Sequence, residues 1–207
     1  MLASNNKLTH LIDLYHSFQQ TIWGQLATYP QPELYHHLLT GKLTPVETDS
    51  LRHQLCQTSH HRDTRKIADY GREILINWLI EDLILRQVLS KKFQKIRLTG
   101  NDQQREFLTG PQITALPDIK ADGKYYDIKS DWTGYWLDKG VIDLRDAEYP
   151  LLLKFSAGLI LILPHERRVG TIDELAGLPV QHGDSHPKWK KPYYALTLPE
   201  ALTWEKW

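Results

Sequence analysis

The chain has little cysteine and no excess of charge of either sign. Its 207 residues include one cysteine, Cys56, which excludes an internal disulfide framework and suits a reducing compartment. Lysine plus arginine and aspartate plus glutamate both number 25. Because the molecule as a whole generates no strong positive field, a nucleic acid would have to bind to a local patch.

The chain also lacks a hydrophobic run long enough to cross a membrane. Its most apolar stretch, ILINWLIEDLIL at residues 74–85, contains two carboxylates, whereas a span needs about 20 predominantly apolar residues. The N-terminus has neither the basic start nor the apolar run of a secretory signal. No P-loop and no glycine-rich dinucleotide motif is found. We therefore expect a soluble, cytoplasmic protein without a membrane partner or a nucleotide cofactor.

The N-terminal part of the sequence has helical patterns. Apolar residues recur at helical spacing between residues 8 and 23. Thr44-Pro45-Val46-Glu47 has the signature of a capping box, which predicts a helix that ends near Gln57. A polar boundary at residues 58–63 precedes one long apolar helix over residues 65–89. We predict three regions: a helical region at 1–62, a core at 63–165 and a C-terminal extension at 166–207.

The hydrophobic period changes after that long helix. Alternation at residues 92–99 predicts a half-buried strand, and residues 117–131 (PDIKADGKYYDIKSD) predict a hairpin. Residues 145–157 predict a helix in which Pro150 must lie in the first turn or else break the helix. GLILILP at 158–164 predicts a buried central strand. The resulting order is helix, strand, strand, strand, helix, strand. This order indicates an α/β fold.

Two features of the C-terminal extension carry further predictions. Thr171-Ile172-Asp173-Glu174 reads as a second capping box, which predicts a short helix that stops near Gly177. His182 and His186 are four residues apart, but the glycine and proline beside them disfavour a helical zinc pair. We interpret both histidines as surface residues.

The hairpin has a defined register and two chemically distinct faces. Asp122-Gly123 predicts a two-residue type I′ turn, which pairs Ala121 with Lys124 and places Asp118 opposite Asp127. Because side chains alternate along a strand, one face is apolar and the other is charged. The apolar face carries Ile119, Ala121, Tyr126 and Ile128. The charged face carries Asp118, Lys120, Tyr125, Asp127 and Lys129.

The opposed aspartates need a compensating charge. Like charges directly across a strand pair are destabilising, and Lys129 stands diagonally from Asp118. Mg²⁺ takes oxygen ligands and typically uses one or two carboxylates together with waters and phosphate oxygens. A lysine beside the metal could orient or deprotonate water, or stabilise transition-state charge. The alternative is a solvated hairpin whose Asp–Lys pairs balance each other.

These residues resemble a known nuclease signature. Pro117-Asp118, followed by Asp127-Ile128-Lys129, is similar to the motif of the PD-(D/E)xK, or restriction-endonuclease-like, superfamily. That family has an α-β-β-β-α-β core, the order read above, and the match covers roughly residues 65–164. The resemblance implies that Asp118, Asp127 and the Ile128 carbonyl bind Mg²⁺, for which Mn²⁺ can substitute. It implies that Lys129 positions or activates the attacking water.

The resemblance also implies a glutamate from the first core helix. Glu73 is the positional candidate, as a catalytic residue that holds a second metal or an outer-shell water. It shares one side of its helix with Asn77 and Glu81, and a solvent-facing stripe explains that spacing equally well. Asp131 belongs to the charged face by parity, but it can equally cap the next segment.

Basic and aromatic residues are the candidates for nucleic-acid contact. They are Lys120 and Tyr125 on the hairpin and Lys188, Trp189, Lys190 and Lys191 in the C-terminal extension. A loop anchored by its tryptophan, with lysines facing water, explains the second group equally well. The aromatic segment 130–140 (SDWTGYWLDKG) follows the hairpin directly.

The predicted function is a Mg²⁺-dependent endonuclease acting on double-stranded DNA. The resemblance is closest in character to small type II restriction enzymes, which makes a sequence-specific homodimer the expected form. Alternatives are a repair, junction-resolving or transposon-associated nuclease of the same fold, and a non-catalytic nucleic-acid-binding protein that retains the fold. The set of two acidic residues and a lysine favours an enzyme.

Overall fold

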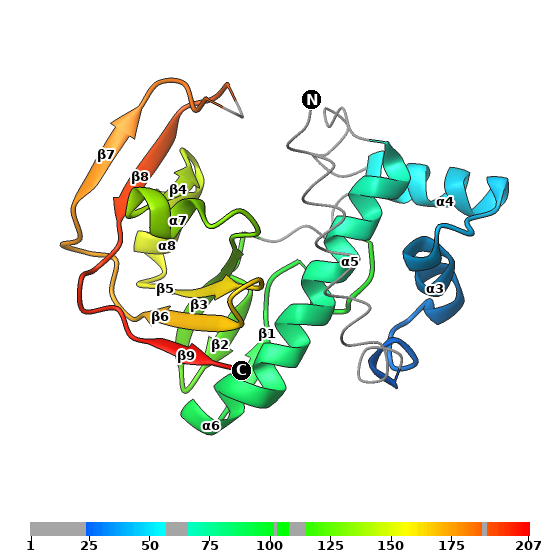
Figure 1. The fold of residues 1–207 in the computed structure, drawn as a ribbon, viewed down its shortest axis with the longest axis horizontal. Coiled ribbons are helices and arrows are strands. Elements are labelled where there is room, and N and C mark those ends of the chain that lie inside the picture. Colours follow the sequence, from blue (N-terminus) through cyan, green and yellow to red (C-terminus); the bar gives the residue numbers. More distant parts are fainter. Residues whose placement is uncertain (1–23, 57–65, 102, 108–114, 188–189) are drawn as a thin grey trace. The chain divides into compact units, whose positions relative to one another are not determined.

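The computed structural model describes residues 24–56, 66–101, 103–107, 115–187 and 190–207. Packing divides the chain into two units. The first, here the helical unit, comprises residues 1–83 and 98–116, and the second, the sheet unit, comprises residues 84–97 and 117–207. The predicted helix over residues 8–23 lies outside the described residues. Figure 1 shows mainly helices in the N-terminal half and mainly strands in the C-terminal half.

The helical unit is built from α3 (Pro32–Thr40), α4 (Pro45–Cys56) and most of α5 (Ile67–Ile84). The predicted capping box at the start of α4 is confirmed. The Thr44 amide donates to Glu47 Oε2 at 2.8 Å, and the Glu47 amide donates to Thr44 Oγ1 at 3.2 Å. The core of this unit contains side chains that are almost fully inaccessible to solvent: Tyr35, Leu38, Leu51, Leu75, Trp78 and Leu79.

Helix α5 continues without interruption into the π-helix η2 (Leu85–Leu89) and the short α6 (Ser90–Lys92). The long apolar helix expected from the sequence is therefore confirmed, with its last turns wound differently. No helix in the described part of the chain is long and apolar enough to cross a membrane.

A buried charge network fixes the segment that contains Arg105 to α5 within the helical unit. Arg105, which is 4% exposed, donates to Glu81 Oε2 at 2.8 Å and through its Nε to Asp82 Oδ1 at 3.0 Å. The Tyr29 hydroxyl donates to the other Asp82 oxygen at 2.7 Å. Burial, followed by the Asp82 charge, raises the pKa of Tyr29, so this phenol stays protonated as the donor.

The sheet unit contains a mixed six-stranded sheet with the order β1-β2-β3-β5-β6-β9. Strand β3 pairs antiparallel with β2 and parallel with β5, while β6 pairs antiparallel with both β5 and β9. All six residues of β5 are buried, as the continuous apolar run predicts. The strands are β1 (Ile96–Leu98), β2 (Ile119–Ala121), β3 (Lys124–Ser130), β5 (Gly158–Leu163), β6 (Arg168–Ile172) and β9 (Trp204–Lys206).

A second, antiparallel sheet has the order β4-β8-β7, made of β4 (Val141–Arg145), β8 (Tyr193–Thr197) and β7 (Val180–Gly183). Between β3 and β5 the chain forms α7 (Tyr135–Lys139), β4 and α8 (Glu148–Lys154). In Figure 1, α8 lies between β4 and β5. One hydrophobic core joins these elements: Ile142, Leu144 and Leu196 from the second sheet, Tyr149 and Leu152 from α8, and Leu159, Leu161 and Leu163 from β5.

The α/β architecture is confirmed, and two local predictions need correction. Strand β4 lies between the hairpin and α8 in the chain and belongs to the second sheet. The order of helices and strands predicted from the sequence does not include this strand. The second capping box is wrong, because Thr171 and Ile172 end strand β6, where they pair with Ile160 and Leu159. Ile172 is 4% exposed. Strand pairing and burial of this side chain outweigh the local capping signal.

Candidate functional site

The hairpin has the predicted register. Ile119 pairs with Tyr126, Lys120 with Tyr125, and Ala121 with Lys124. Asp122 and Gly123 both have positive φ, 47° and 91°, as a type I′ turn requires. The apolar face is buried, with Ile119, Ala121, Tyr126 and Ile128 each at most 7% exposed. The pattern of turn residues and alternating polarity thus predicted both the pairing and the buried face.

Asp118 comes directly before β2 and turns its carboxylate toward β3. Its Oδ2 accepts a hydrogen bond of 2.7 Å from the Ile128 amide. This bond fixes the Asp118 side chain beside the peptide that joins Asp127 to Ile128. Asp127 itself is 9% exposed and follows Tyr126 on β3. The Asp118 carboxylate therefore lies beside the backbone of β3, and its charge acts on Lys129 together with that of Asp127.

Lys129 completes this cluster from the same strand face as Asp127. Its Nζ forms an ion pair with Asp127 Oδ2 and a second ion pair, of 2.6 Å, with Glu148 Oε1. In the parallel register Asp127 and Lys129 are opposite Leu159 and Leu161, whose side chains enter the core that includes α8. The charged face of β3 therefore looks toward α8, which explains why a glutamate of that helix reaches the lysine.

Glu148 is the member of the cluster that the sequence reading missed. It begins α8, and its Oε2 accepts a hydrogen bond of 3.1 Å from the Arg145 amide. One carboxylate oxygen is thus fixed to the backbone while the other meets Lys129. Glu148 is the first residue of α8, and the amide that it binds belongs to Arg145, two residues before the N-cap residue Ala147, so the arrangement is not a capping box. Nothing local indicated that it would face Lys129.

The electrostatics of the cluster follow from one ammonium among several carboxylates. Burial lowers the pKa of Lys129, but the charges of Asp127, Glu148 and Asp118 outweigh it and hold the pKa well above its usual value. Burial raises the pKa of Glu148, and the Lys129 charge and hydrogen bond lower it to a net value below normal. At neutral pH the cluster therefore contains a charged Lys129 paired with an ionised Glu148.

The donor set of the cluster fits a hard divalent cation. Among the described residues there is no group of three or more His, Cys, Asp and Glu side chains arranged to hold a metal. Asp118, Asp127 and the Ile128 carbonyl instead offer two carboxylates and a neutral oxygen, which is what Mg²⁺ uses when waters and phosphate complete its shell. Asp127 Oδ2 is buried and, apart from its Lys129 ion pair, accepts no hydrogen bond of regular geometry in the described structure.

The other predicted site residues have separate surroundings. Glu73 lies on α5 in the helical unit and is half-buried. Its role as a catalytic residue stays a prediction. Asp131 is 7% exposed and acts as a cap. Its Oδ1 accepts from the Thr133 amide and hydroxyl, and its Oδ2 accepts from the Trp136 amide at 2.8 Å. These bonds agree with the interpretation of Asp131 as a cap of the following segment.

The candidate nucleic-acid residues fall into two groups. The Lys120 ammonium lies over the Tyr125 ring, 4.8 Å from its centroid, on the charged hairpin face. Lys190 and Lys191 are exposed. The Lys190 amide donates to the His186 carbonyl and the His186 amide donates to the Lys191 carbonyl, both at 2.8 Å. Lys188 and Trp189 lie outside the described residues.

His186 corrects the expectation that it is a surface residue. It is 8% exposed, and its Nε2 lies 3.0 Å from Asp143 Oδ2 on β4. His182 lies on β7 with its Nε2 3.2 Å from Asp146 Oδ1. Each histidine is therefore paired with a different aspartate, and the two do not form a zinc pair on a helix.

In the aromatic segment, Trp132 and Trp136 are buried, at 5% and 8% exposed. Tyr135 and Leu137 are about 40% exposed. Two of the segment's aromatic side chains therefore serve the core rather than a ligand.

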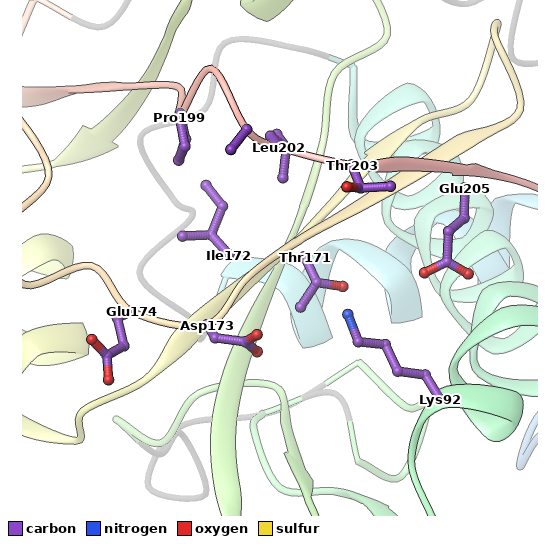
Figure 2. A pocket seen from close by; sticks show the side chains of 10 residues that line it. Lys92, Thr171, Ile172, Asp173, Glu174, Pro199, Leu202, Thr203 and Glu205 are labelled. Carbon is purple, nitrogen blue, oxygen red and sulfur yellow. The ribbon is translucent and has the colours of Figure 1, made fainter.

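A shallow pocket lies elsewhere in the sheet unit. Its volume is about 340 Å³, and it is lined by residues of α6, β6, β9 and the segments beside them. Figure 2 shows the Lys92 ammonium end directed toward Thr171, with the carboxylates of Asp173 and Glu205 on either side. None of the predicted site residues lines this pocket, so it is separate from the cluster on β3.

Comparison with family models, curated proteins and solved structures gives no match to this chain.

Proposed function

We propose that the chain is a Mg²⁺-dependent endonuclease that hydrolyses phosphodiester bonds in double-stranded DNA, with a restriction-endonuclease-like core. The observation that supports this most is the cluster on the hairpin: the Asp118 carboxylate bonded to the Ile128 amide, with Asp127 and Lys129 on the same strand face. A purely structural role of the hairpin does not require the carboxylates of Asp118 and Asp127 near one lysine, because like charges on paired strands destabilise the pairing. The parallel β3–β5 pair next to a hairpin agrees with such a core.

Each residue of the cluster has a part in this proposal. Asp118, Asp127 and the Ile128 carbonyl would hold Mg²⁺. When bound, the ion supplies Lewis-acid polarisation of the phosphate and a more acidic water. The raised pKa of Lys129 makes it a cationic donor at neutral pH, suited to orient water and to stabilise charge on the phosphate rather than to remove a proton. Glu73 remains the candidate for a second metal or an outer-shell water.

Nucleic-acid contact and assembly belong to the same proposal. Lys120 and Tyr125 share the charged hairpin face with the cluster and would meet the backbone nearest the cleaved bond. Lys190 and Lys191, which are exposed, are candidates for more distant phosphate contacts. A homodimer would allow both strands to be cut.

The test is incubation of the purified protein with supercoiled and linear DNA of known sequence, in Mg²⁺ or in EDTA. Discrete fragments in Mg²⁺ alone indicate sequence-specific cleavage, and a smear indicates a general nuclease. Protein that binds duplex DNA but leaves it intact with Mg²⁺ and with Mn²⁺ contradicts the proposal and supports the non-catalytic alternative.

A further inference from the structure

Glu148 gives the Lys129 ammonium a second carboxylate partner that no feature of the motif explains. Its Oε1 is 2.6 Å from Lys129 Nζ, and the same Nζ also pairs with Asp127 Oδ2. The second Glu148 oxygen is bonded to the Arg145 amide at 3.1 Å, so the carboxylate has a fixed orientation at the start of α8. The Glu148 and Asp127 side chains are only 24% and 12% exposed, which limits screening by water.

This arrangement creates a competition at Asp127. The oxygen that pairs with Lys129 belongs to a carboxylate that would also hold the cation, so a cation that uses this oxygen has to displace the ammonium. An ammonium with a single carboxylate partner would resist displacement, because its charge would be left buried and unpaired. With Glu148 in place, the ammonium keeps a partner.

We propose that Glu148 is a positioning residue that receives the Lys129 ammonium and thereby frees Asp127 to bind a divalent cation. This inference rests on the proposed function, since it assumes that Asp127 is a metal ligand. It adds a residue outside the motif and a reason for its placement: α8 supplies a second carboxylate partner for the lysine, one that is not among the proposed metal ligands. Lys129 then remains fixed beside the cluster when the cation is bound.

We expect the effect of Glu148 on cation binding to depend on the presence of Lys129. The measurement is a Mn²⁺ titration without DNA, in which the free ion is followed by electron paramagnetic resonance. Glu148→Gln should raise the midpoint concentration at least about fivefold, because the ammonium then stays on Asp127. In a Lys129→Met background the same substitution should change the midpoint less than about twofold, because no ammonium competes.

Two further variants test whether the effect depends on the position and the charge of Glu148. Glu166→Gln removes an exposed carboxylate of the same unit, one that pairs with Arg168 at 3.1 Å, and controls for the loss of a negative charge. Glu148→Asp keeps the charge on a shorter side chain and should give an intermediate midpoint. Circular dichroism and thermal melting identify any variant that has lost its fold, and in that case Glu148→Asp and Lys129→Met carry the comparison.

The outcomes separate the inference from the proposed function. Suppose that wild-type protein binds Mn²⁺ and cleaves DNA, but Glu148→Gln shifts the midpoint equally in both backgrounds or not at all. The proposed role of Glu148 as a partner for the displaced ammonium is then wrong, while the proposed nuclease function is supported. If wild-type protein neither binds Mn²⁺ nor cleaves DNA, the proposed function is wrong and this inference falls with it. Coupling confined to the background that contains Lys129 supports the inference.

Discussion

Replacement of Lys129 by methionine should destabilise the sheet unit measurably. Methionine keeps most of the side-chain volume but removes the charge that Asp127 and Glu148 share. Breaking a fully buried ion pair by removal of one partner costs about 3–5 kcal/mol. Because the Glu148 side chain is 24% exposed, and that of Asp127 12%, we expect a smaller loss of roughly 2–3 kcal/mol after allowance for screening by water.

The assay is thermal unfolding at pH 7 in EDTA, so that no divalent cation replaces the lost charge. For a chain of this size each kcal/mol shifts Tm by about 2–4 °C, which predicts a decrease of roughly 4–12 °C. Lys139→Met is the matched control, because Lys139 pairs with Asp138 at 2.8 Å with both side chains more than half exposed. Such a surface pair contributes about 0–1 kcal/mol, so the control should shift Tm by at most about 4 °C.

The pH dependence of this difference in Tm tests whether the ion pairs of Lys129 cause it. The pKa of Glu148 is below its ordinary value of 4.5, so its contribution to wild-type stability is full above that pH and is lost as pH falls through the lowered pKa. The gap in Tm between wild type and Lys129→Met should therefore be largest at neutral pH and shrink below about pH 4.5. A gap of less than about 1 °C at pH 7, or one that widens in acid, would show that the Lys129 ion pairs do not stabilise the sheet unit.

Three further predictions concern features outside the cluster. Arg105→Ala leaves its two carboxylate partners on α5 buried without their cation and should cost about 3–5 kcal/mol in urea unfolding; an unchanged midpoint would contradict this. Gly158→Ala would drive a Cβ into the Ile172 carbonyl oxygen, so a loss of about 1–3 kcal/mol is expected, and a melting curve identical to wild type would argue against that contact. The Thr44 amide bond lowers the pKa of Glu47 to about 2, so protection of the Thr44 amide from hydrogen exchange should persist at pH 4.5 and fall only toward pH 2; loss already at pH 4.5 would contradict the capping bond.

The sequence predicted those features that depend on neighbouring residues. The Asp122-Gly123 turn fixed the pairing of β2 with β3, because loop length and turn type determine register in a hairpin. The continuous apolar run predicted β5, which is buried along its whole length. The capping box at Thr44 predicted the start of α4.

Features that depend on distant pairing were missed or wrong. Strands β7 and β8 form a second sheet with β4, and their short, mixed sequences have no clear period. The box at Thr171 failed because pairing with β5 decides that segment. Glu148 went unnoticed because its contact with Lys129 spans α7 and β4, which no local pattern can indicate. The order of helices and strands was therefore easier to read than the partners of single charges.

The most direct test of the nuclease proposal compares Mg²⁺-dependent cleavage of a supercoiled plasmid by the wild-type protein and by Asp118→Asn. The amide oxygen of asparagine can still accept from the Ile128 amide, so the hairpin should keep its fold while the cluster loses one charge. We expect cleavage by wild type in Mg²⁺ and none in EDTA, with the rate reduced at least about 100-fold in the variant. Equal rates in the two proteins, or an intact plasmid with folded wild-type protein in both Mg²⁺ and Mn²⁺, would contradict the nuclease proposal.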